Sequence, residues 1–241
     1  MKRSVLLFSL VILFSSLSTS FAENKFVQSA KVDLDGDGKT DSIVLSGITA
    51  NGSFHLKINT VSADGKFDSD PVDGFLVIDI DKQDNYKEIA VHTPGPSDDD
   101  EYLIYWYDGK SIQKMEHLSR WPEFLGNGIV YVKNWMGFWS QNNKYVLDKK
   151  NRKLYEVPQE FYAVGVEATV KESFPIYKTR EYKDVVAYLK PETKMTLLVC
   201  DPSPAGKYSS WSYLVKSSSG LIGWARENQF SQKVQGLPLA D

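Results

Sequence analysis

The chain has 241 residues, of which 42% are hydrophobic and 24% are charged, and its formal net charge is -3. This composition is typical of a soluble globular protein of one or two domains, and no stretch is dense enough in lysine and arginine to favour a nucleic-acid partner. Cys200 is the only cysteine, which excludes an intramolecular disulfide and zinc sites built from several cysteines. Because it lies in the apolar run MTLLVC, we expect a buried side chain rather than a reactive thiol.

The first 22 residues have the pattern of a signal peptide. A basic start, MKR, precedes the apolar run VLLFSLVILF, and Ser20 and Ala22 have the small-residue spacing of a cleavage site. Cleavage removes Lys2 and Arg3, which leaves 26 basic against 31 acidic residues and a charge of -5. No later run is long enough to span a membrane. We therefore expect an exported protein, periplasmic or secreted, with no transmembrane segment after cleavage.

Strand patterns dominate from residue 26 onward. Alternating, β-branched or aromatic runs predict strands, in chain order, in SFHLKINTV, GFLVIDID, EYLIYWYDGKSIQKM, GIVYVKN and MTLLVC. Polar turns predict three hairpins, one around Asp108-Gly109 and two in VLDKKNRKLYEV and YLVKSSSGLIGWA. Only REYKDVVAYLK has a short helical pattern, which Pro191 ends. The sequence predicts an all-β protein.

Residues 30 to 46, AKVDLDGDGKTDSIVLS, contain an acidic loop. Calcium takes about six to eight oxygen ligands, and ligands at alternate positions let a short loop wrap the ion. The loop offers four carboxylates and one backbone carbonyl at such positions, from Asp33, Asp35, Asp37, Asp41 and Lys39. Val44 stands where an EF-hand would have its closing glutamate, so an EF-hand is excluded. Calcium is the favoured interpretation; a solvated acidic turn and another metal are the alternatives.

A second, weaker acidic loop follows in LVIDIDKQDNYKEIAV. Placing Asp33 on Asp79 puts Asp35 on Asp81 and Ile43 on Ile89, but Gln83 and Lys87 then replace the third and fourth aspartates. Asp84 and Glu88 could substitute from neighbouring positions, which gives Asp79, Asp81 and Asp84 as a weaker metal set. A metal-free turn held by hydrogen bonds is the favoured interpretation. A third unit starts at GNGIVYVKN, and the spacing is typical of propeller blades or solenoid units.

The segment DLDGDGKTDSIVL resembles the calcium loops of FG-GAP and VCBS-type repeats, the strand-flanked loops of integrin-like β-propeller blades. DIDKQDNYKEIAV resembles a divergent form, and the resemblance covers roughly residues 28 to 135. It implies blade-like antiparallel repeats over residues 23 to 160 and calcium ligands at Asp33, Asp35, Asp37, Asp41 and the Lys39 carbonyl. Since two or three units cannot close a propeller, a partial assembly is expected.

The C-terminal part is similar to bacterial Src-homology-3-like domains, on VVAYLKPETKMTLLV followed by SSWSYLVKSSSGLIGWA. The resemblance implies a small β-barrel over residues 163 to 230, followed by a tail over 231 to 241. The composition changes near residues 158 to 165, PQEFYAVG, and this change predicts a domain boundary there. Such domains commonly bind cell-wall peptides or other extended ligands, which would make Trp211, Tyr213 and Trp224 ligand-binding residues. A core role for these aromatic residues is the alternative, and ATVKESFPIYK lacks the arginine-serine pattern often seen in the first strand.

No catalytic motif is present in the sequence. His92 is the best candidate catalyst, but a structural histidine is favoured, and no Gly-x-Ser-x-Gly or His-Glu-x-x-His pattern occurs. We expect a non-catalytic, exported calcium-binding protein that binds a cell-envelope ligand (a peptidoglycan peptide, a polysaccharide or a protein) through its β domains. The alternative is an envelope hydrolase or carbohydrate-binding module that uses aromatic and acidic loops, with tryptophans that could stack on sugar rings at Trp106, Trp121, Trp135 and Trp139.

Overall fold

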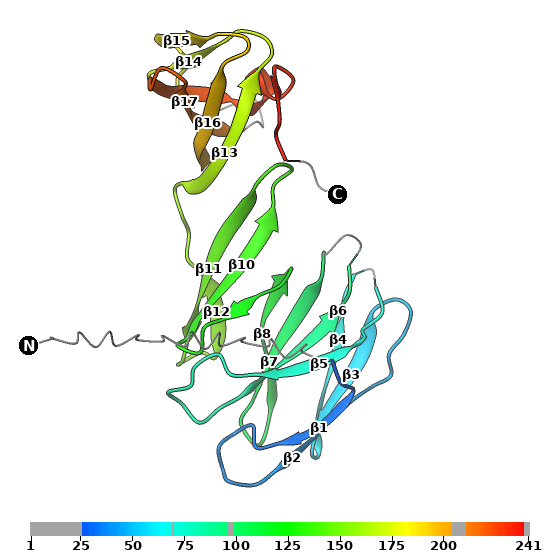
Figure 1. Cartoon of the computed structure of the whole chain (residues 1–241). Helices are drawn as coiled ribbons and strands as arrows, with labels where there is room; N and C mark the ends of the chain where they lie inside the picture. Colours follow the sequence, from blue (N-terminus) through cyan, green and yellow to red (C-terminus); the bar gives the residue numbers. More distant parts are fainter. Residues whose placement is uncertain (1–25, 69, 96–98, 204–210, 239–241) are drawn as a thin grey trace, which may run out of the picture.

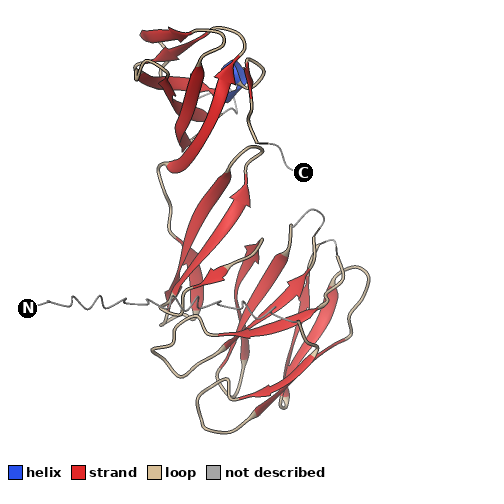
Figure 2. Ribbon diagram, viewed as in Figure 1, coloured by secondary structure: helices blue, strands red, loops and turns tan. Residues whose placement is uncertain are grey.

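The computed structural model describes residues 26–68, 70–95, 99–203 and 211–238. The predicted signal peptide lies outside these residues. The described residues form four antiparallel β-sheets and one short helix, α1 (Glu227–Phe230), so the all-β prediction is confirmed (Figure 2). None of the described helices has the length and hydropathy that a membrane span requires.

The first three sheets each have four strands that follow one another along the chain (Figure 1). The first sheet contains β1 (Ser29–Val32), β2 (Asp41–Ser46), β3 (Ser53–Ile58) and β4 (Val61–Lys66). The second contains β5 (Gly74–Ile78), β6 (Glu88–Thr93), β7 (Glu101–Tyr107) and β8 (Ile112–Ser119). The third contains β9 (Glu123–Phe124), β10 (Ile129–Trp135), β11 (Ser140–Asp148) and β12 (Lys153–Glu156). The hairpins predicted at Asp108-Gly109 and in VLDKKNRKLYEV are β7–β8 and β11–β12.

These three sheets pack face to face in a row. One core joins the first and second sheets, with Leu56 on β3 and Leu103 on β7 among its members. A separate core joins the second and third sheets, with Ile104 on β7 and Val132 on β10 among its members. The second sheet therefore has both faces buried, and all six residues of β6 are buried. In β2, by contrast, buried and exposed residues alternate, because one face of the first sheet meets solvent.

The last sheet has seven strands in the order β15-β14-β18-β17-β16-β13-β19. Their bounds are β13 (Tyr162–Val170), β14 (Phe174–Tyr177), β15 (Val185–Leu189), β16 (Lys194–Asp201), β17 (Ser212–Ser217), β18 (Ile222–Arg226) and β19 (Val234–Gln235). The predicted hairpin in YLVKSSSGLIGWA is β17–β18. The order has two free ends, so the pairing of the described strands does not close the predicted barrel.

One further expectation for this region is wrong, and one segment has more structure than its name suggests. The segment predicted as a short helix ends in β15, whose residues pair with β14 instead of forming a helical turn. The predicted tail contains β19, in which Val234 pairs with Val170, and Leu237 packs against the same core. In both β15 and β19, packing of a short apolar run against the rest of the sheet determines the strand conformation, and local sequence preference does not.

The tip of the β10–β11 hairpin belongs to the core of the last sheet. Phe138 and Trp139 are buried there, although the strands beside them belong to the third sheet. The indole Nε1 of Trp139 donates a hydrogen bond of 3.2 Å to the hydroxyl of Tyr213 on β17. Cys200 lies in this core with no exposed surface, and burial raises the pKa of its thiol to about 12. An inert core cysteine, as predicted, fits this position.

Candidate metal loop and aromatic surface

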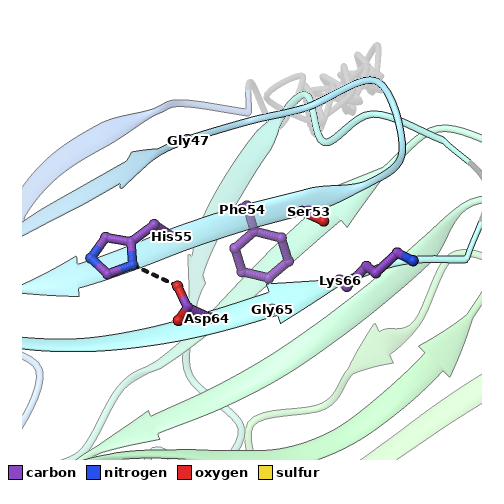
Figure 3. Close-up of a pocket in the computed structure, with 7 residues that line it drawn as sticks. All are labelled: Gly47, Ser53, Phe54, His55, Asp64, Gly65 and Lys66. Atoms are coloured by element: carbon purple, nitrogen blue, oxygen red, sulfur yellow. Dashed lines mark hydrogen bonds and ion pairs between the residues drawn. The ribbon is translucent and has the colours of Figure 1, made fainter.

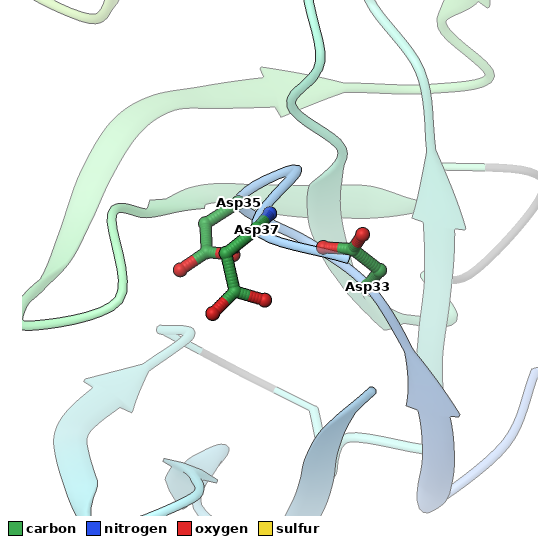
Figure 4. Close-up of side chains that lie close together, drawn as sticks. All are labelled: Asp33, Asp35 and Asp37. Carbon is green, nitrogen blue, oxygen red and sulfur yellow. The ribbon is translucent and has the colours of Figure 1, made fainter. Parts of the chain in front are cut away.

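The loop between β1 and β2 gathers three of the predicted ligands. Asp33, Asp35 and Asp37 each offer a carboxylate oxygen, and these oxygens lie within 4.8 Å of one another (Figure 4). Two oxygens bound to one calcium ion can lie at most about 5 Å apart, which is twice the usual calcium–oxygen distance. The spacing of the three carboxylates therefore suits a single ion.

Hydrogen bonds within the loop hold this arrangement. The two oxygens of Asp33 accept the backbone N–H groups of Gly36 (2.8 Å) and Gly38 (3.0 Å). Both glycines have positive φ, at 75° and 80°, a conformation that other residues rarely adopt. A Cβ atom on Gly36 would also lie 2.4 Å from Cβ of Asn85 in the second acidic loop. The first loop thus needs glycine both for its turn and for close contact with its neighbour.

Lys39 and Asp41, the remaining predicted ligands, are placed differently. The ammonium of Lys39 lies 2.9 Å from Oδ2 of Asp37, and this hydrogen bond holds the pKa of the Asp37 carboxyl below its usual value. Asp41 is buried, and its two oxygens accept hydrogen bonds from the Leu34 N–H (2.9 Å) and the Asn59 side-chain amide (2.7 Å). Asp41 therefore closes the base of the loop and lies outside the three-carboxylate group.

The second acidic loop is a closer copy of the first than its sequence indicates. Three hydrogen bonds from backbone N–H to carboxylate recur in both loops, and they match Asp35 with Asp81, Asp37 with Asp84, and Asp41 with Glu88. The second loop has one extra residue between its second and third carboxylates.

This extra residue shifts the following strand by one position. Ile43 on β2 faces the next sheet in the row, the second. Ala90 on β6, its counterpart after the shift, likewise faces the next sheet, the third. Ile89 faces back toward the first sheet. The predicted match of Ile43 with Ile89 is therefore wrong by one residue, which in a strand reverses the face.

In the second loop, basic side chains lie against the carboxylates. Lys149 forms an ion pair with the buried Asp81, and this contact lowers the pKa of the Asp81 carboxyl. The guanidinium of Arg152 lies 3.0 Å from Oδ2 of Asp84 and stacks over the ring of Tyr86, 4.3 Å from its centroid. Both cations come from the β11–β12 turn of the third sheet. They supply positive charge that a metal ion would otherwise supply.

The first loop meets a different turn at the equivalent place. The turn between β7 and β8 of the second sheet approaches it with Gly109, where an added Cβ atom would lie 2.5 Å from Oδ2 of Asp35. No basic side chain from this turn is ion-paired with Asp33 or Asp35 among the described residues. The first loop keeps its carboxylates without the cations that the second loop has.

The three predicted ligand-binding residues of the last sheet differ in their exposure to solvent. Tyr213 has no exposed surface, so it cannot contact a ligand, and burial raises the pKa of its hydroxyl. Trp211 is partly buried and packs against the same core. Trp224 is partly exposed. Its neighbours in the structure, Phe161 and Arg180, were not predicted from the sequence. The ring of Phe161 lies 6.1 Å from that of Trp224, and the Arg180 guanidinium lies over both rings.

Arg180 is held in place by acidic neighbours. It forms an ion pair with the buried Asp201 of β16 and lies 4.0 Å from Glu160. The hydrogen bond to Asp201 raises the pKa of the guanidinium and lowers that of the carboxyl, although burial opposes the shift at Asp201. The result is an aromatic and cationic surface, Phe161, Arg180 and Trp224, in which the Arg180 guanidinium is held by its ion pair with Asp201 on β16.

His92 has the surroundings of a structural residue. Its ring is 2% exposed and stacks on Phe26 with the centroids 3.9 Å apart. Nδ1 lies 2.7 Å from Oδ1 of Asp73, and Nε2 lies 3.0 Å from Oδ1 of Asp100. Both ring nitrogens are therefore occupied, which favours the structural interpretation over a catalytic one.

A shallow pocket of about 450 Å³ lies on β3 and β4 around His55 and Asp64 (Figure 3). Nδ1 of His55 is 2.7 Å from Oδ1 of Asp64, and both side chains are exposed. The hollow exists because Gly65 leaves room for the ring of Phe54, whose Cζ would lie 2.1 Å from an added Cβ atom. A glycine beside a packed ring explains this pocket.

Comparisons of the chain with protein-family models, curated proteins and solved structures found no match.

Proposed function

We propose that this is an exported, non-catalytic protein in which calcium stabilises a row of blade-like β repeats and a Src-homology-3-like sheet binds a cell-envelope ligand. The observation that carries the calcium part is the contrast between the two acidic loops. Asp33, Asp35 and Asp37 converge without a cation from a neighbouring turn, whereas Asp81 and Asp84 are paired with Lys149 and Arg152. Lys39 of the same loop pairs with Asp37, but three crowded carboxylates with one ammonium group still repel one another, so a bound cation would stabilise the first loop.

The blade and Src-homology-3-like assignments rest on the sequence resemblances together with the strand order. Three successive four-stranded meanders, each stacked on the next, suit a partial row of FG-GAP or VCBS-type blades. The hairpin β17–β18 and the returning Trp224 suit the C-terminal resemblance. The envelope ligand would contact the surface formed by Phe161, Arg180 and Trp224, because an aromatic pair beside a fixed guanidinium can hold an extended peptide or sugar.

Calcium binding is tested by thermal unfolding with calcium and with a chelator. Calcium at about one hundred times its Kd adds about 2.7 kcal/mol to the free energy of unfolding, which raises Tm by several degrees. Asp35→Asn should abolish the difference between the two conditions. Asp81→Asn is the matched control: it breaks the ion pair with Lys149 and lowers Tm, but the chelator effect should persist. An identical melting curve for the wild-type chain in calcium and in chelator rules out the metal.

Ligand binding is tested by co-sedimentation with purified peptidoglycan. Phe161→Ala and Trp224→Ala should each reduce the bound fraction several-fold, because each removes one ring under Arg180. Tyr188→Ala on β15 is the control, since Tyr188 is the most exposed of the large hydrophobic side chains of the same sheet, at 65%, and lies outside this surface. Undiminished sedimentation of both variants would show that the surface is not the binding site.

A further inference from the structure

The two ends of the row of sheets have different chemistry. The far face of the first sheet is mainly polar: its outward side chains include Ser42, Ser46, His55, Lys57, Ser62 and Asp64, and Val44, at 39% exposed, is its large apolar member. The far face of the third sheet exposes large apolar side chains instead, with Tyr155 at 52%, Val146 at 37% and Val157 at 36%. Stacked repeats need a polar face at each end to remain soluble. The third sheet exposes these apolar side chains at its end of the row, so this surface is a candidate for ligand contact.

Strand register orders the side chains of this surface into neighbouring rows. Val146 lies opposite Tyr155 in the β11–β12 pair. In the next row Tyr131 lies opposite Lys144, and the N–H of Val157 donates to the carbonyl of Lys144 at 2.7 Å. Lys144 therefore has an aromatic residue, Tyr131, on one side and an aliphatic residue, Val157, on the other.

A third row is polar. Lys133 lies opposite Asn142, and the side-chain amide of Gln159 donates to the carbonyl of Asn142 at 2.9 Å. This contact leaves the Asn142 amide and the remaining capacity of the Gln159 amide for other partners. The surface thus changes from aromatic and aliphatic to amide and ammonium across its rows.

The last two rows line a pocket of about 340 Å³ where the third sheet meets β13. Its lining includes Tyr131, Asn142, Lys144, Val157, Gln159 and Tyr162. Small-molecule sites have volumes of about 300 to 1,000 Å³ and combine apolar walls with a few convergent polar groups, often at domain junctions. The pocket meets these criteria at their lower limit of volume, which suits one unit of a longer chain lying across the surface.

The charge of the surface selects an anionic ligand. No ion pair involves Lys133 or Lys144 among the described residues. Glu123, opposite Tyr131 on β9, is the carboxylate next to them in register. The expected mature chain has a net charge of -5, so two unpaired ammonium groups on an apolar face are a local exception to its charge.

We propose that this surface, the Tyr131–Lys144–Tyr155 surface, binds a glycan that carries carboxylate groups. Tyrosine rings offer flat apolar faces for pyranose rings, the amides can bond to hydroxyl groups, and Lys144 can pair with a carboxylate. A second copy of the chain suits the surface less, since two such faces would oppose their lysines and the described far face of the first sheet offers only Val44 as a large, exposed apolar side chain. The inference uses a different surface from the proposed envelope site, so either can fail independently.

The test measures binding of a hyaluronan decasaccharide, in which alternate sugars carry a carboxylate, to the chain without its predicted signal peptide. Isothermal titration should show saturable binding that weakens with added salt. Lys144→Gln should reduce the affinity about tenfold or more, since a charge-assisted contact is lost. Lys144→Arg should retain binding, which separates loss of charge from misfolding. Lys57→Gln, an exposed lysine at the polar end of the row, should change nothing.

Two comparison ligands decide the class. A neutral chitin hexasaccharide should bind at least several-fold more weakly than hyaluronan, because it has no carboxylate for Lys144. Poly-L-glutamate should also bind more weakly, because it has no sugar rings for Tyr131 and Tyr155. Equal affinity for poly-L-glutamate would replace the glycan by an acidic peptide, and equal affinity for chitin would remove the role of charge. Absence of saturable hyaluronan binding, or wild-type affinity in Lys144→Gln, would overturn the proposal.

Discussion

Glu88 has a structural role in the second acidic loop that sequence alignment did not reveal. It is 1% exposed, and its Oε2 accepts the Ile80 N–H at 3.0 Å, which is the role that Asp41 has in the first loop. Burial raises the pKa of the Glu88 carboxyl to about 7, and the nearby charges of Asp84 and Asp79 act in the same direction. A linear alignment puts Lys87 at this position, because sequence spacing does not reveal where a loop takes an extra residue.

The raised pKa predicts a particular pH dependence. Between pH 4.5 and about 7 the folded chain holds a proton on Glu88 that the unfolded chain has lost, so this residue reduces stability as pH rises through that range. Glu88→Gln keeps the acceptor for Ile80 and removes the titration. The variant should gain about 1 to 3 kcal/mol relative to wild type between pH 5 and pH 8, measured by urea unfolding. A constant difference between the two proteins across this range would contradict the prediction.

At the scale of elements, strands, hairpins and the number of buried faces of a strand follow from sequence patterns, whereas contacts between distant loops do not. The run DSIVLS alternates and EIAVHT is nearly continuous, and this difference corresponds to one buried face in β2 and two in β6. The grouping of carboxylates in the first acidic loop was predictable because its aspartates are local in sequence. The cations of the second loop were not, since Lys149 and Arg152 lie about 70 residues away and reach it only through sheet stacking.

The β10–β11 hairpin tip gives a prediction at the same scale. Trp139→Ala would leave a cavity in the core of the last sheet and remove the hydrogen-bond donor to the Tyr213 hydroxyl. Replacing a buried aromatic residue by alanine costs about 3 to 5 kcal/mol. Hydrogen exchange should therefore quicken in β16 and β17, while β2 and β3 keep their protection. Equal loss of protection in both regions would show that the chain unfolds as a single unit.

At the scale of the whole molecule, the first three sheets form a row, and the last sheet is connected to it both through the chain and through side chains. The strand pairing changes between Glu156 and Tyr162, an interval that overlaps the predicted boundary region of residues 158 to 165. The core does not divide at that point, because Phe138 and Trp139 from before the boundary are buried beyond it. A boundary drawn from composition follows the covalent chain, and it cannot detect an element that packs across it.

The burial of the hairpin tip predicts that the two parts stay associated without the covalent connection between them. If a protease cuts the backbone between Val157 and Phe161, the N-terminal fragment should still hold the C-terminal one through Phe138 and Trp139. Gel filtration of the nicked wild-type protein should give one peak containing both fragments, and nicked Trp139→Ala should separate into two. Two separately expressed fragments should likewise reassemble, which would make the chain a split protein in which a four-residue turn and its two aromatic rings take the place of a peptide linker.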